Sequence, residues 1–176
     1  MKPISKPALA SVLALLATTY GCLEIEKLPP EPRIEFRNFT VFDTTDILGN
    51  EAKAGRLVFY FEDGDGDLGL AESQSQTPEE RNLFLTLYRK TGEVMVPAET
   101  TDPLFPSPYR IPYMERLGQN KILKGEITVV LLYLFYEESD IIMYDFFIRD
   151  RALHDSNIES TCEIALGENG SCNEAR

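Results

Sequence analysis

The stretch IIMYDFFIRD at residues 141–150 decides the fold class, because apolar side chains recur in it at every second position. In an extended chain Ile142, Tyr144, Phe146 and Ile148 fall on one side and the intervening side chains on the other. A period of two over this length predicts a β-strand with those four side chains turned toward a core.

The same period continues in runs on either side, which are bounded by glycine, proline and acidic turn residues. Further strands are predicted over residues 33–42, 55–62, 82–90, 93–96, 121–136 and 158–166. The side chains expected to face the core from the longer runs are Ile34, Phe36, Phe39, Val41, Leu57, Phe59, Phe61, Leu83, Leu85, Leu87, Ile127, Val129, Leu131 and Tyr133. Five prolines between residues 97 and 112 exclude a central strand there. We expect an extended surface segment, with room for an edge strand near residues 109–114.

About seven strands without an amphipathic helical pattern predict an all-β fold, an immunoglobulin-like antiparallel β-sandwich. Tyr144, early in the sixth predicted strand, is either the tyrosine corner of such a fold or a core tyrosine whose hydroxyl reaches the rim.

The N-terminus has the pattern of an export signal. Lys2 and Lys6 precede an apolar run, residues 8–19, which is too short to cross a bilayer core of about 30 Å. The run ends at Gly21 and Cys22, an arrangement that resembles the lipobox of bacterial lipoproteins, although Thr19 stands where leucine is usual. We predict cleavage before Cys22 and lipidation of its thiol; the alternative is an ordinary secretory signal followed by an unrelated cysteine.

This signal divides the chain into four parts. Residues 1–21 are the lipoprotein signal peptide, residues 22–33 a lipidated, proline-rich tether, residues 34–167 the sandwich and residues 168–176 a C-terminal tail. Without the two signal lysines, 15 basic residues face 29 acidic ones, a net charge of about −14. Such a surface disfavours nucleic acid and anionic lipid and favours cations or basic partners, although solubility alone also explains it.

Two cysteines remain in the predicted mature chain, Cys162 and Cys172. An even pair in an oxidising compartment predicts a disulfide, and two free thiols are the alternative. Their spacing fits neither a redox motif nor a zinc site of the Cys-x-x-Cys type.

The acidic loop DGDGDLG at residues 63–69 is a candidate cation site. Asp63, Asp65 and Asp67 alternate with glycines that permit tight curvature, and carboxylate oxygens are the ligands that Ca²⁺ prefers. If the second and sixth predicted strands are B and F of an immunoglobulin-like fold, the B–C and F–G loops share one end of the sandwich. Asp150, Asp155 and Asn157 are then further candidate ligands of a Ca²⁺ site near the tether. The alternative is a solvated turn whose aspartates cap their own backbone.

Several segments together resemble a family. These are the acidic loop, residues 109–112 (YRIP), residues 124–127 (KGEI) and the stretch from Tyr144 through Asp150 to Asn157. They are similar to uncharacterised Bacteroidetes-type lipoproteins with an immunoglobulin- or cadherin-like domain. The resemblance implies that sandwich fold and brings no catalytic residue with it.

The sequence predicts no enzyme. His154 is the only histidine, and the chain has no P-loop, dinucleotide fingerprint or nucleophile elbow. We therefore expect a membrane-tethered, non-enzymatic binding or structural module of the cell envelope, anchored at the outer membrane and meeting an envelope protein or a glycan. A carbohydrate-binding accessory, with or without Ca²⁺, is the alternative, and a small hydrolase the remote one. Residues 132–136 (LYLFY) are either a binding face or, as we expect, a strand buried on both faces.

Overall fold

The computed structural model describes residues 28–71, 81–115 and 121–173. The predicted signal peptide, Cys22, most of the tether and residues 174–176 lie outside the described residues. The described strands are β1 (Arg33–Thr45), β2 (Glu51–Asp63), β3 (Leu83–Thr91), β4 (Val94–Pro97), β5 (Leu123–Tyr133), β6 (Ile141–Ile148), β7 (Glu159–Ser160), β8 (Ile164–Ala165) and β9 (Gly170–Asn173). Among the described residues, no helix has the length and apolarity needed to cross a bilayer.

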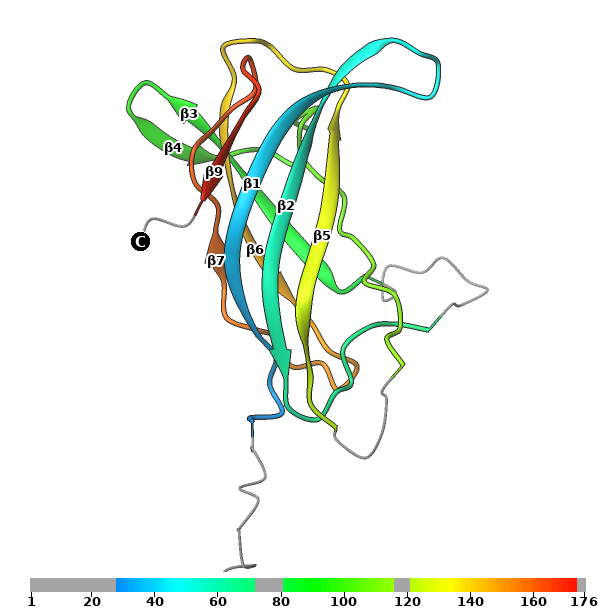
Figure 1. The fold of residues 1–176 in the computed structure, drawn as a ribbon. Helices are drawn as coiled ribbons and strands as arrows, with labels where there is room; N and C mark the ends of the chain where they lie inside the picture. Colours follow the sequence, from blue (N-terminus) through cyan, green and yellow to red (C-terminus); the bar gives the residue numbers. More distant parts are fainter. Residues whose placement is uncertain (1–27, 72–80, 116–120, 174–176) are drawn as a thin grey trace, which may run out of the picture.

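Two antiparallel sheets pack face to face, in the strand orders β5-β2-β1-β9 and β4-β3-β6-β7, with β8 also paired to β6 (Figure 1). Strands β1, β2 and β5 take the places of A, B and E of an immunoglobulin-like domain, and β3, β6 and β7 those of C, F and G. The predicted fold class, an immunoglobulin-like antiparallel β-sandwich, is confirmed.

A long hairpin forms the backbone of the first sheet. β1 pairs with β2 from Arg33 opposite Glu62 to Thr45 opposite Glu51, with a β-bulge between Phe36 and Asn38. Because the bulge adds one residue to β1, the inward side chains change from even to odd positions along that strand. This shift lets every apolar side chain predicted for β1 reach the core.

The core lies where the predicted inward side chains of the two sheets meet. The predicted side chains of β1, β2, β3 and β6 are buried, as are Leu131 and Tyr133 of β5, while Ile127 and Val129 pack at the margin. The rings of Phe59 and Phe146 lie 5.2 Å apart across the two sheets. Tyr144 is a core tyrosine: its hydroxyl lies 3.3 Å from that of Tyr133, so its side chain does not form a tyrosine corner.

The C-terminal part differs from the prediction. Instead of one strand over residues 158–166, the chain forms two short strands, β7 and β8. The segment predicted as a tail contributes β9, which pairs with β1 from Asn38 opposite Asn173 to Val41 opposite Gly170. The sandwich therefore extends past residue 167, because the edge of β1 offers hydrogen bonds that a local pattern does not reveal.

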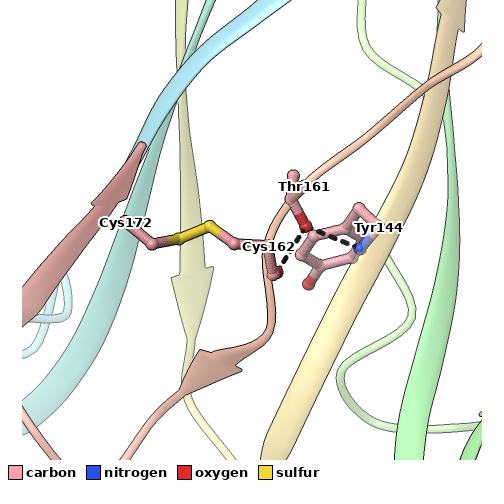
Figure 2. Close-up of a disulfide and its surroundings, with 4 residues drawn as sticks. All are labelled: Tyr144, Thr161, Cys162 and Cys172. Atoms are coloured by element: carbon pink, nitrogen blue, oxygen red, sulfur yellow. Dashed lines mark hydrogen bonds between the residues drawn. A yellow bond between two sulfur atoms is a disulfide. The ribbon is translucent and has the colours of Figure 1, made fainter. Parts of the chain in front are cut away.

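A disulfide between Cys162 and Cys172 joins these C-terminal elements (Figure 2). Cys162 lies between β7 and β8 on one sheet, whereas Cys172 lies on β9 of the other. Thr161 anchors the β7 side, since its hydroxyl accepts a hydrogen bond from the backbone N–H of Tyr144 at 3.0 Å. The disulfide therefore links the two sheets along one open side of the sandwich.

The proline-rich segment after β4 is not a strand. Tyr109 forms a single bridge with Leu83, and Pro112 forms one with Leu70. Asn82, which is buried, accepts a hydrogen bond from the backbone N–H of Ile111 at 2.6 Å. These contacts fix the segment beside β3, and within the described ranges no strand pairs with β5 on the side away from β2.

Candidate functional site

The acidic loop follows directly from the end of β2. Gly66 and Gly69 adopt positive φ angles of 67° and 92°, which curl the chain so that Asp63, Asp65 and Asp67 turn toward one another. One carboxylate oxygen from each of the three lies within 4.8 Å of the others. The predicted convergence of alternate carboxylates is therefore present in the fold.

Asp63 sets the shape of the loop from a fully buried position. Its carboxylate oxygens accept hydrogen bonds from the backbone N–H of Gly66 at 3.1 Å and of Leu68 at 2.6 Å. These bonds are the Asx-type contacts expected of a turn. The loop therefore has both predicted features. An aspartate caps the backbone of its own turn, and the three carboxylates cluster as in a cation site.

The cluster concentrates negative charge. Burial raises the pKa of Asp63, and the adjacent carboxyl group of Asp65 adds to this effect. Burial also raises the pKa of Asp67, reinforced by the negative charges of Asp150 and Asp65. Ionised Asp63 and Asp67 therefore destabilise the folded state near neutral pH. A bound cation would offset both the cost of burying their charges and the repulsion between the carboxylates.

The loop after β6 meets this cluster, as the B–C and F–G assignment predicts. Asp150 is buried and close enough for its charge to act on Asp67. Arg151 donates a hydrogen bond to the carbonyl oxygen of Gly69 at 2.7 Å, which holds the two loops together. Both loops lie at the lower end of the sandwich in Figure 1, where the chain enters β1.

The other two predicted ligands lie elsewhere. Asp155 forms a two-pronged ion pair with Arg149, at 2.5 and 2.8 Å. Asn157 accepts a hydrogen bond from the backbone N–H of Ile34 at 2.9 Å and donates one to the carbonyl oxygen of the same residue at 3.0 Å. The structure therefore does not bring these two residues into the cluster of Asp63, Asp65 and Asp67, because each satisfies its polar atoms with another part of the fold.

The segment that leads into β1 packs against the acidic loop. A Cβ atom on Gly64 would lie 2.1 Å from the carbonyl oxygen of Pro29 and 2.5 Å from that of Leu28. Only glycine admits so close an approach of two backbones. This role could not be predicted from the sequence, where Gly64 is simply one glycine of an acidic turn.

His154 completes this end of the sandwich. Its Nδ1 lies 2.8 Å from Asp150, and this hydrogen bond raises the pKa of the imidazole. The nearby hydroxyl of Ser156 donates to the carbonyl oxygen of Asn157 and accepts from the N–H of Ile148. Both bonds direct Ser156 toward the backbone and not into a nucleophile–base pair with His154.

Chemically, the cluster offers hard oxygen ligands. Asp63, Asp65 and Asp67 can each supply one, and Asp150 adds negative charge from the opposite loop. Ca²⁺ takes six to eight oxygens, so backbone carbonyl oxygens or waters would complete its shell.

One surface differs from the sequence interpretation. The strand expected to be buried on both faces near residues 132–136 instead exposes Leu132, Leu134 and Phe135, while Tyr133 is buried. Every residue from Val129 to Tyr136 is apolar or aromatic, so the sequence does not mark which face of the strand is exposed. Comparisons of the chain with protein-family models, with curated proteins and with solved structures found no significant match.

Proposed function

We propose that this protein is a bacterial lipoprotein of the Bacteroidetes type whose β-sandwich is held at the outer membrane by acyl chains on Cys22. The observation that carries the proposal is the apolar run that ends at Gly21 and Cys22 after two lysines. The disulfide between Cys162 and Cys172 supports it, because such bonds persist in oxidising compartments such as the periplasm and the cell surface.

The module acts by binding or by structural support, not by catalysis. Its most distinctive polar cluster, around Asp63, Asp65 and Asp67, offers hard ligands for a cation.

The partner of the module is an envelope protein or a glycan. Of the two most exposed aromatic side chains described, Tyr113 lies near the acidic loop and Phe135 follows the far end of β5, so these two do not form one stacking platform. A protein partner is therefore favoured over a glycan.

Replacing Cys22 with serine is expected to move the protein from the membrane fraction to the soluble fraction. Two acyl chains contribute about 0.8 kcal/mol for each buried CH₂ group, and the variant has no thiol to carry them. Fractionation followed by a high-salt wash measures the effect. A matched variant, Thr19→Leu, brings the signal closer to the usual lipobox and should stay in the membrane pellet. Retention of Cys22→Ser in the salt-washed pellet would contradict the proposal.

We also propose that the acidic loop binds Ca²⁺, which fixes the loops at this end of the sandwich. At a Ca²⁺ concentration about 100-fold above Kd, binding adds about 2.7 kcal/mol, which raises the melting temperature of a domain of this size by about 5–10 °C. Asp67→Asn should abolish most of that increase. In chelator the same variant should melt slightly higher than wild type, because the raised pKa of Asp67 marks its ionised form as destabilising.

Thermal unfolding followed by circular dichroism, with 10 mM CaCl₂ or with EDTA, tests this second proposal. Asp155→Asn is the matched control, since Asp155 pairs with Arg149 outside the cluster, and it should keep the full response to Ca²⁺. Wild-type melting curves that coincide in Ca²⁺ and in chelator would overturn it.

A further inference from the structure

Strand β5 is the end strand of its sheet, and no other described strand pairs with it on the side away from β2. Its one neighbour in the sheet is β2. The light-green segment that runs beside β5 in Figure 1 directs its backbone elsewhere: Tyr109 exchanges hydrogen bonds with Leu83, and the N–H of Tyr113 donates to Leu70 at 2.9 Å. The strand that would pair here in an immunoglobulin-like domain, D, has no counterpart among the described residues.

From Thr128 onward, this edge lacks the features that usually keep strand edges from pairing, whereas the start of β5 carries Lys124 and Glu126. From Thr128 to Leu134 the chain has no charged side chain and no proline. On the outer face of β5, Val130 and Leu132 expose about half of their surface, at 52% and 47%. Natural proteins protect long edges with lysine, proline or bulges, so an open apolar edge is a template for another strand.

A groove lies between this edge and the proline-rich segment. One cavity of about 420 Å³ is lined by Tyr109, Ile111 and Met114 on one side and by residues 127–130 on the other. A second, of about 230 Å³, shares Tyr109 and continues along residues 131–133 of β5. The two cavities lie one after the other along β5, next to residues 127–130 and then 131–133. An extended peptide that paired with β5 would therefore place successive side chains in them.

The charges along the groove indicate what fits it. The only charged residues that line the two described cavities are Arg110 in the first and Arg81 in the second. The Nε atom of Arg110 is buried and has no hydrogen-bond partner, although its Nη2 donates to the carbonyl oxygen of Leu70. In a protein whose net charge is −12, a groove lined by arginines favours acidic groups in its occupant.

We propose that the groove binds an extended peptide segment of a partner protein, with alternating apolar and acidic side chains, as an additional strand on β5. The peptide backbone pairs with the free edge, apolar side chains enter the groove, and a carboxylate meets Arg110. This assignment rests on the binding role proposed above. It is tested on the mature chain from residue 22 with Cys22→Ser, so that a failure of the lipid anchor does not affect the outcome.

The probe is a blocked ten-residue peptide that alternates valine and glutamate, with fluorescence anisotropy as the readout. We expect saturable binding, and at least about tenfold weaker binding of a matched peptide that alternates valine and lysine. Two further peptides carry N-methyl groups on every second amide, in one or the other phase. Because only one edge of the peptide pairs with β5, one methylated peptide should bind and the other should not.

Arg110→Gln should weaken binding of the valine–glutamate peptide about tenfold, since it replaces a charged hydrogen-bond donor. Arg56→Gln, on β2 opposite Val130, is the matched control and should leave binding unchanged. Circular dichroism verifies that both variants fold. Equal binding of the acidic and basic peptides, equal binding of both methylated peptides, or equal effects of the two arginine variants would each overturn the proposal. So would a dimer in light scattering that Val130→Lys dissociates, because the occupant would then be a second copy of the chain.

Discussion

Replacing Phe146 with alanine is expected to lower the free energy of unfolding by about 4 kcal/mol. Phe146 is fully buried at the centre of β6, and its ring packs at 5.2 Å from Phe59 of the opposite sheet. Truncation removes the transfer free energy of the ring and leaves a cavity that two hydrogen-bonded sheets cannot close. A loss of this size is a large part of the total stability of a domain, which is typically about 5–15 kcal/mol.

The neighbouring residue supplies the control. Phe147 has the same side chain but faces outward, where it stacks on Phe84 at 4.9 Å under the guanidinium of Arg149. Phe147→Ala should cost about 1 kcal/mol, since it loses one partly exposed aromatic contact. Urea denaturation followed by far-UV circular dichroism measures both variants, because the chain has no tryptophan for fluorescence. Equal losses for the two variants would mean that β6 does not present alternate faces as described.

Breaking the disulfide has the second largest expected effect. Cys172→Ser should destabilise the protein by about 3 kcal/mol, the chain-entropy estimate for a loop closed over a separation of 10 residues. The loss of stability should appear first at β9, because only four paired positions hold this strand to β1. Faster hydrogen exchange at residues 170–173 is therefore expected before the rest of the sandwich opens.

The measurement is urea denaturation with and without a reducing agent. Wild type should lose stability on reduction, whereas Cys172→Ser should unfold at the same urea concentration in both conditions. The double variant Cys162→Ser, Cys172→Ser is the control for an unpaired thiol and should match the single variant. If the wild-type midpoint is unchanged by reduction, the disulfide does not contribute to stability.

The candidate site was predictable in part. The spacing of Asp63, Asp65 and Asp67 is local, so the sequence could indicate their convergence, and the strand assignment placed Asp150 at the same end. Asp155 could not be assigned correctly, because the ion pair with Arg149 depends on how the chain turns after β6. The same holds for Asn157 and its bonds to β1.

By itself the sequence determined the all-β class, the faces of the long strands and the acidic loop. Each of these follows from residues that alternate at every second position, a pattern that neighbouring residues in the sequence show directly. The tertiary structure alone decided three further features: the pairing of β9 with β1, the contact of Gly64 with Leu28 and Pro29, and the place of β5 at the end of its sheet, with the groove beside it. Each depends on which distant segments meet. A local pattern carries no information about such partners, since the same residues are compatible with a paired or an unpaired edge.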